Sequence, residues 1–142
     1  MSLPLTTARA MIAATLEHAA KAGFKPLTVV VLDAGGHVVA AERSDGSSAK
    51  RFEIAHGKAH GAVALGMGTR ALMARAEQQG YFIAAVGSAI GGALVPVPGG
   101  VLVKDEGGAV LGAVGVTGDL SDNDEAAALA GIAAVGLVAQ PD

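Results

Sequence analysis

Two hairpin signatures constrain the fold of this chain more than any other feature. In each, an apolar run enters an Asp-x-Gly-Gly turn and a second apolar run leaves it. Residues 27–32 and 38–41 flank the turn at Asp33, and residues 101–103 and 109–116 flank the turn at Asp105. Runs rich in β-branched residues favour strands, and glycine adopts the positive φ that tight hairpin turns require. The sequence therefore predicts four strands in two antiparallel pairs.

A corner rich in proline and glycine precedes the second hairpin. Pro96 and Pro98 cannot donate to a strand ladder, and Gly99 and Gly100 leave bare backbone in a conformation that favours glycine. The corner, the second hairpin and the acidic start of a following helix all lie within residues 94–125. We therefore expect a pocket in this region, where the backbone N–H groups of Gly99 and Gly100 are available to a ligand.

Apolar residues recur at helical spacing outside the hairpins. The predicted helices are a first one that Thr6 or Thr7 caps and Gly23 ends, a second from Ser47 or Ser48 to Gly66, a third over residues 69–79, and a last from Ser121 or Asp122 to Ala139. Residues 81–93 are compatible with a short helix or a strand. Because the last helix is apolar on nearly all sides, we expect it to lie at a contact between copies of the chain.

Composition excludes several classes of protein. The length of 142 residues fits a single domain over residues 1–142, and a net charge of −3 with scattered Lys and Arg gives no footprint for nucleic acid. The absence of cysteine rules out disulfides, thiolate catalysis and covalent c-type haem, and it fits a cytoplasmic protein. No apolar run reaches the roughly 20 residues of a membrane span, and the N-terminus lacks the basic region of a signal peptide. We therefore expect no membrane segment.

Glu53, His56 and His60 share one face of the second predicted helix, because they are spaced i, i+3 and i+7. Two imidazoles and a carboxylate suit a transition metal, and a single imidazole suits the iron of a haem. The segment is not the HExxH motif of zinc proteases, because glycine and not glutamate follows His56. The alternative is a pair of partly exposed histidines on a polar helix face.

Two charged clusters offer further candidate sites. Arg43, Asp45 and Lys50 follow the second predicted strand and suit a small carboxylate, although a salt-bridged turn explains them equally well. Four carboxylates crowd the start of the last helix, at Asp119, Asp122, Asp124 and Glu125. They would repel a phosphate, and stabilisation of the helix dipole explains them better than a divalent cation does. No nucleophile elbow or P-loop is present, so catalytic residues are left unassigned.

Several segments together carry a resemblance to a known family. They are VVVLDAGGHVVAAERSDG, the helix EIAHGKAHGAVALGM, the run LVPVPGGVLVKDEGGAVLGAVGVTG and the following DNDEAAALAGIAAV. In this order they closely resemble the GlcG/HbpS family of haem-binding or haem-degrading-like proteins, which includes the C-terminal domain of PduO-type cobalamin adenosyltransferases. The resemblance implies a profilin-like three-layer α/β (α+β) sandwich, with an antiparallel sheet of about five strands and helices on both faces, assembled into dimers to octamers.

Three functions are compatible with this resemblance. The first is a tetrapyrrole (haem)-binding accessory protein, with haem-degrading activity in some members, in which His56, His60 or Tyr81 is the axial ligand. The residues expected around the cofactor are His56, His60, Lys58, Arg43, Gly99 and Gly100. A corrinoid is an alternative cofactor, and so is a divalent metal held by Glu53, His56 and His60. The second function is a binder or enzyme for a small organic acid, and the third is a structural oligomeric module without a ligand. Whether the chain catalyses a reaction is left open.

Overall fold

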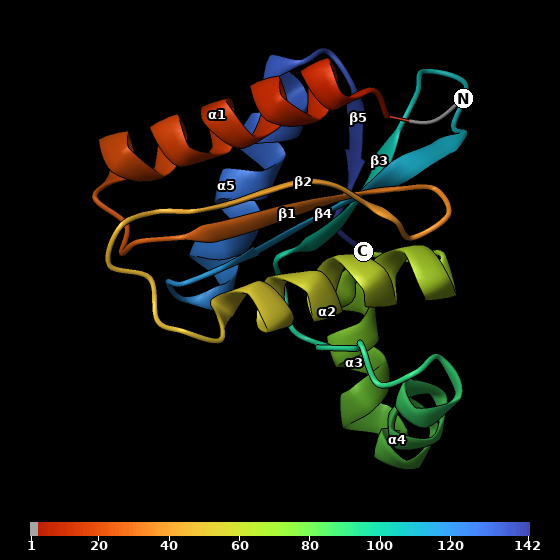
Figure 1. The fold of residues 1–142 in the computed structure, drawn as a ribbon. Helices are drawn as coiled ribbons and strands as arrows, with labels where there is room; N and C mark the ends of the chain where they lie inside the picture. The colour runs from red at the N-terminus through yellow and green to blue at the C-terminus, as the bar shows by residue number, and fades with distance from the viewer. Residues whose placement is uncertain (1–2) are drawn as a thin grey trace.

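The two predicted hairpins form and pair with each other in the computed structural model, which describes residues 3–142 (Figure 1). Strand β1 (Thr28–Asp33) pairs with β2 (Val38–Arg43), and β3 (Gly100–Lys104) pairs with β4 (Val110–Thr117). β1 also pairs with β4, which joins the hairpins into one sheet. A fifth strand, β5 (Val138–Gln140), adds to β3. The strand order is β2-β1-β4-β3-β5, and every pair is antiparallel.

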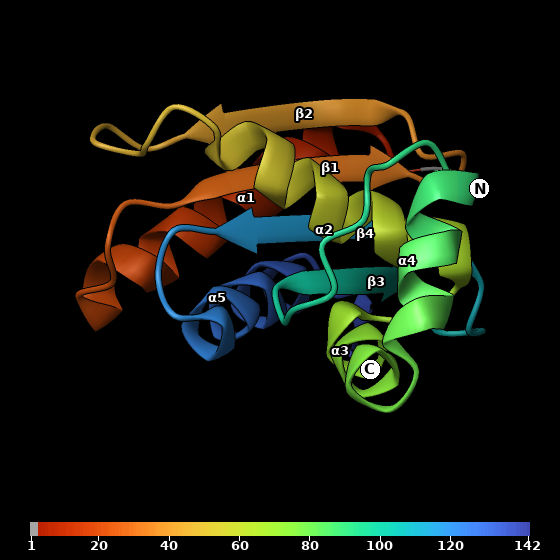
Figure 2. The ribbon, with the colours of Figure 1, turned by 90° about the horizontal axis from the view of Figure 1, so that it is seen from below.

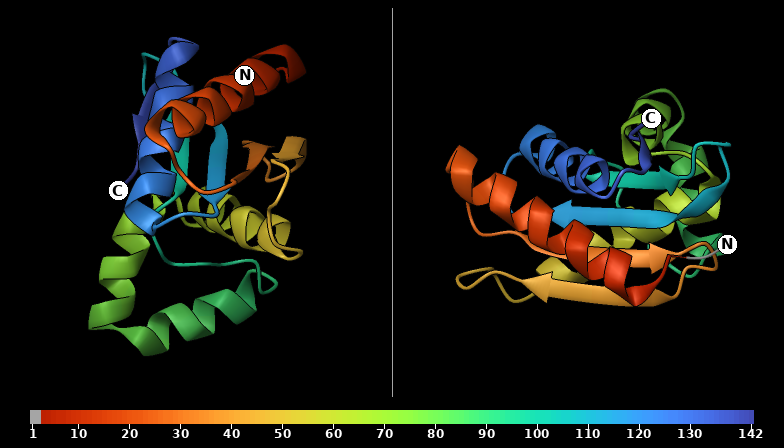
Figure 3. Two further views of the ribbon diagram at one scale, coloured as in Figure 1. Left: turned by 90° about the vertical axis from the view of Figure 1, so that its left-hand side faces the viewer. Right: turned by 90° about the horizontal axis from the view of Figure 1, so that it is seen from above.

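Helices cover both faces of this sheet. The helices of residues 3–142 are α1 (Leu5–Ala22), α2 (Arg51–Leu65), α3 (Thr69–Gln78), α4 (Gly80–Ala89) and α5 (Ser121–Ala134). α1 and α5 lie side by side on one face, and α2 lies on the other (Figure 3). The structure thus confirms the predicted α/β architecture of an antiparallel five-stranded sheet between helical layers.

Alternating strand residues build two cores, one on each face. In β1, Val29 and Val31 face α1 and α5, whereas Val30 and Leu32 face α2. The contribution of α2 to its core consists of the small residues Ala55, Ala59 and Ala62. The helix therefore approaches the sheet closely, and a Cβ on Gly115 of β4 would overlap the carbonyl oxygen of Ala55. This close packing fixes the position of the helix that carries the candidate histidines.

One side of α5 is buried within the chain. Ala128 and Ile132 are fully buried in the core that α5 shares with α1, and a Cβ on Gly131 would overlap the hydroxyl of Thr15 in α1. Leu129 and Leu137 pack against the same core. The apolar composition that suggested a contact between copies is thus explained by α1 and the sheet. Homo-oligomerisation stays a prediction.

The last predicted helix is wrong at its C-terminal end. α5 stops at Ala134 and not at Ala139, Gly136 takes a φ of 73°, and residues 138–140 form β5. Small apolar residues are compatible with both a helix and a strand, and the partner strand β3 is distant in sequence. The local pattern therefore did not distinguish the end of the helix from the strand. The predicted side-chain caps are also absent from α1, α2 and α5, whose N-cap residues are Pro4, Lys50 and Leu120.

α3 and α4 form an L-shaped corner that extends away from the sheet on the α2 side (Figure 1), and α3 is seen end-on where α4 runs across the view (Figure 2). The ambiguous segment 81–93 is thus helical over most of its length. The guanidinium of Arg75 lies 4.0 Å from the ring centroid of Phe82, which ties the two helices together. No helix within residues 3–142 has both the length and the hydrophobicity to cross a membrane.

Candidate functional site

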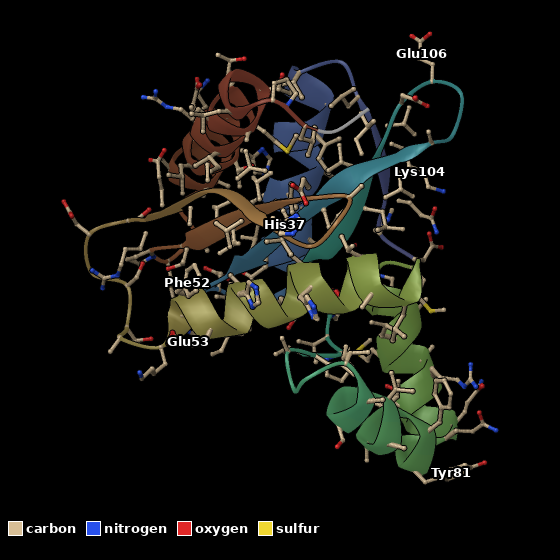
Figure 4. All side chains as sticks on the ribbon, turned by 45° about the vertical axis from the view of Figure 1, so that its right-hand side comes forward. His37, Phe52, Glu53, Tyr81, Lys104 and Glu106 are labelled. Atoms are coloured by element: carbon tan, nitrogen blue, oxygen red, sulfur yellow. The ribbon has the colours of Figure 1, made fainter. Side chains whose placement is uncertain are left out.

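Three rings stand in a row along α2. Phe52, His56 and His60 are spaced four residues apart, so their side chains share one face of the helix. The ring centroids of Phe52 and His56 are 5.8 Å apart with planes inclined by 18°, and those of His56 and His60 are 5.6 Å apart with planes inclined by 17°. We call these three residues the ring row. Figure 4 labels Phe52 at the N-terminal end of α2, where the row begins.

The imidazole of His60 is held in one tautomer by the loop that precedes β3. Its Nδ1 lies 2.9 Å from the carbonyl oxygen of Ala93. A carbonyl oxygen only accepts, so Nδ1 donates its proton and Nε2 of the neutral ring keeps a free lone pair. The ring also lies against Gly36, where a Cβ would be 3.6 Å from His60 Cδ2. Two loops therefore position this imidazole, and the contact to Ala93 leaves its Nε2 unused.

His56 lies between the other two rings of the row and is half-buried. Burial lowers the pKa of His56, and the charge of neighbouring His60 lowers it further. His56 therefore stays neutral to lower pH than an ordinary histidine. The row thus places an aromatic ring and a histidine with a lowered pKa beside His60.

Glu53 does not join the two histidines. Its side chain is 57% exposed, and its carboxylate lies 3.6 Å from Nζ of Lys50. Within the described part of the chain, no three His, Cys, Asp or Glu side chains lie close enough to share a metal ion. The structure thus brings together His56 and His60 and leaves out the carboxylate of the predicted metal site.

Lys58, Gly99 and Gly100 do meet, but in the interior. Lys58 is 2% exposed, both glycines are buried, and the N–H of Gly100 donates to Thr69 Oγ1 at 2.8 Å. Gly99 has a φ of 123°, which confirms the special backbone expected at this corner, and a Cβ there would lie 2.8 Å from Lys58 Nζ. The Lys58 side chain fills the space where the sequence predicted a pocket. These three residues are therefore closed to a ligand in this structure.

Arg43 lies at a cavity between β2 and the first turn of α2. The cavity has a volume of about 180 Å³, and its lining residues are Thr28, Ala41, Glu42, Arg43 and Phe52. We call it the Arg43 cavity. Phe52 is also the first member of the ring row, so this one residue joins the cavity to the row. Thr28 is not among the predicted site residues, and its only signal in the sequence is a hydroxyl residue inside an otherwise apolar strand.

Two further sets of candidate residues lie elsewhere. Tyr81 is 74% exposed on α4, far from the Phe52 end of the ring row (Figure 4). The acidic start of α5 is paired within the chain, since Arg70 contacts Asp122 at 2.6 Å and Glu125 at 3.0 Å. Asp124 pairs with buried Lys58. These ion pairs explain the acidic cluster without a bound cation.

Comparison with known proteins identifies the family to which this chain belongs. The family model described as haem degrading protein HbpS-like matches residues 3–133. A crystal structure of PduOC in complex with haem is similar, with a TM-score of 0.86 and 25% identity over 97% of this chain and 98% of that chain. None of the curated proteins matches the chain.

Two further solved structures show the same fold. A double mutant of HbpS from Streptomyces reticuli is similar with a TM-score of 0.79 and 30% identity, over 94% of this chain and 86% of that chain. The protein ORFY from Klebsiella pneumoniae is similar with a TM-score of 0.85 and 25% identity, over 94% of this chain and 90% of that chain. The match thus extends over nearly the whole of each chain.

Proposed function

The chain belongs to the family of HbpS-like haem-degrading proteins, and from this membership and the geometry of α2 we propose that it binds haem through the imidazole of His60. The observation that carries the proposal is the 2.9 Å contact from His60 Nδ1 to the carbonyl of Ala93. Histidines that ligate a metal commonly donate their other N–H to a carbonyl or carboxylate, which fixes the ring and raises the basicity of the ligating nitrogen. His60 has this arrangement before any ligand is added.

The surface around His60 suits a flat, largely apolar macrocycle. His56 and Phe52 continue the ring row away from His60, and the lowered pKa of His56 keeps that ring neutral. Phe52 is 40% exposed, so its ring is accessible to a ligand. When bound, haem would supply a redox-active iron. The chain itself would supply one axial nitrogen and an apolar surface that excludes water from one side of the macrocycle.

Equilibrium binding of hemin and of metal-free protoporphyrin tests this proposal. Coordination by His60 predicts saturable binding near one hemin per chain, with a shifted Soret band and an affinity at least about tenfold above that for protoporphyrin. Equal affinity for hemin and protoporphyrin would show that the iron is not coordinated and would contradict the role of His60.

The family name also suggests a more specific function, the degradation of haem. Incubation of the hemin-loaded protein with ascorbate in air separates the two cases. In a degrader the Soret band decays faster than that of free hemin, whereas in a binder it persists. We propose binding as the primary function, with degradation decided by this assay.

Homo-oligomerisation and a cytoplasmic location accompany this proposal as predictions from the sequence and the family resemblance. Sedimentation of the purified protein tests the first. A mass between dimer and octamer supports it, and a monomer at micromolar concentration contradicts it.

A further inference from the structure

The hydroxyl of Thr28 is buried without a hydrogen-bond partner. Thr28 is 1% exposed, and its Oγ1 is the one buried side-chain nitrogen or oxygen within residues 3–142 that lacks a partner. Buried polar atoms are nearly always satisfied, so such an atom calls for an explanation such as a missing ligand. Thr28 lines the Arg43 cavity. The unpaired hydroxyl therefore belongs to a residue of the cavity wall.

Polar residues on three neighbouring strands extend from this hydroxyl. Arg43 of β2 is opposite Thr28 of β1, and Thr28 is opposite Thr117 of β4. Directly opposed residues of antiparallel strands share one face of the sheet, so all three lie on the face that carries α2. Arg51, the first residue of α2, donates from Nη1 to Thr117 Oγ1 at 2.8 Å. Two arginine residues and two threonines thus lie close together on this face.

Neither guanidinium has a carboxylate partner within the described residues. The Nη2 of Arg43 donates to the carbonyl of Ser47, and the Nε of Arg51 donates to Ser48 Oγ at 3.1 Å. Glu42 also lines the Arg43 cavity, but it is opposite Val29, whose side chain faces the other core. Its carboxylate therefore points toward the opposite face of the sheet. Arg43 is therefore the charged lining residue on the face of the sheet that carries α2.

The size of the cavity limits what it holds. Its volume of about 180 Å³ lies below the roughly 300 to 1,000 Å³ of pockets that enclose a whole cofactor or drug-sized ligand. A carboxylate with a few carbon atoms fits this volume. Phe52 and Ala41 provide apolar wall for the carbon atoms, and Arg43 and Thr28 provide donors for the oxygens.

We propose that the Arg43 cavity binds a carboxylate, with the guanidinium of Arg43 and the hydroxyl of Thr28 as donors and the ring of Phe52 against its carbon chain. Two sources have this chemistry, a propionate arm of a bound haem and a free small carboxylic acid. For the first source the inference deepens the proposed function, because Phe52 connects the cavity to the ring row. For the second source the inference is independent of haem.

Three variants isolate the two donors. Arg43→Gln removes the guanidinium and Thr28→Val removes the hydroxyl with little change of shape. Arg9→Gln removes the same charge from an exposed position on α1, across the sheet, and is the control. Because the Thr28 hydroxyl is unpaired in the free protein, Thr28→Val should leave the melting temperature unchanged or raise it, while lowering ligand affinity.

Hemin, hemin dimethyl ester and sodium propionate separate the two sources. If a haem propionate occupies the cavity, Arg43→Gln and esterification each weaken hemin binding about tenfold to a hundredfold, and Arg43→Gln has no further effect on the ester. If a free acid occupies it, propionate binds the wild type, and both Arg43→Gln and Thr28→Val abolish that binding. Arg9→Gln changes neither ligand.

The remaining outcomes distinguish this inference from the proposed function. Propionate binding without any hemin binding would support the cavity and overturn the haem proposal. Equal hemin affinity in wild type, Arg43→Gln and Thr28→Val, together with no propionate binding, would overturn the cavity and leave the haem proposal standing. Absence of binding by all three ligands would overturn both.

Discussion

Lys58 Nζ lies 3.2 Å from Asp124 Oδ2, and this contact joins α2 to α5 although the two helices cover opposite faces of the sheet. Both side chains are 2% exposed, and Lys58 also donates to the carbonyl of Val116 at 2.8 Å. Burial lowers the pKa of Lys58 and raises the pKa of Asp124, while the attraction between the two charges opposes both shifts. Each charge therefore depends on the other.

Replacing Lys58 with Met should strongly destabilise the fold, because it leaves the carboxylate of Asp124 buried and unpaired. We expect a loss of about 3 to 5 kcal/mol in the free energy of unfolding, measured by urea denaturation. Replacing Asp124 with Leu in the same chain should recover part of that loss. Lys50→Met, at an exposed lysine, is the control and should change stability by less than about 1 kcal/mol. Similar effects at Lys58 and Lys50 would contradict the buried pair.

Alanine at Gly99 should destabilise the protein more than alanine at Gly108. Both glycines have positive φ, 123° and 89°, so each substitution strains the backbone by about 1 kcal/mol. Only at Gly99 would the new Cβ also meet other atoms, with the carbonyl oxygen of Val116 at 2.6 Å, whereas nothing lies within 4 Å at Gly108. Thermal unfolding of the two variants measures the difference. Equal shifts in melting temperature would mean that the corner relaxes easily.

The hairpins were predictable because their signals are local. Each strand is a β-branched run, and each turn carries a glycine that takes positive φ, Gly36 at 83° and Gly108 at 89°. The strand β5 was not predictable in this way, since the same small apolar residues suit a helix and its partner β3 lies far back in the chain. Tertiary pairing decided the conformation there.

In the candidate site too, features with a local sequence signal were predictable and features that depend on distant residues were not. The spacing of His56 and His60 on one helix predicts their proximity, which the structure confirms. The partner of Lys58 lies 66 residues away, and the neighbours of Thr28 come from two other strands, so neither relationship leaves a local pattern. The sequence predicts Lys58 at a ligand, whereas the structure buries its side chain beside Asp124.

Asp119 should make stability depend on pH in acid. Its carboxylate accepts hydrogen bonds from the N–H groups of Lys25 and Leu120 and from Asn123, which lower its pKa from 3.8 to about 2. A lowered pKa in the folded state gives stability that is present above pH 3.8 and is lost as the pH falls toward 2. Asp119→Asn should therefore be less stable than wild type at neutral pH and equally stable near pH 2.

Denaturant unfolding between pH 2 and 7 measures this difference. Glu106→Gln removes one negative charge at the exposed tip of the β3–β4 hairpin and is the control (Figure 4). A stability gap between wild type and Asp119→Asn that does not change with pH would contradict the role of the ionised carboxylate.

The most direct test of the account is a hemin titration of wild type and His60→Ala, followed by the Soret band. His18→Ala, on α1 across the sheet, is the matched control. Ligation through His60 Nε2 predicts that wild type and His18→Ala bind about one hemin per chain with the same shifted band. His60→Ala should lose that shift and bind at least tenfold more weakly, at about the affinity for metal-free protoporphyrin. An unchanged Soret band and affinity in His60→Ala would contradict the claim that this imidazole holds the iron.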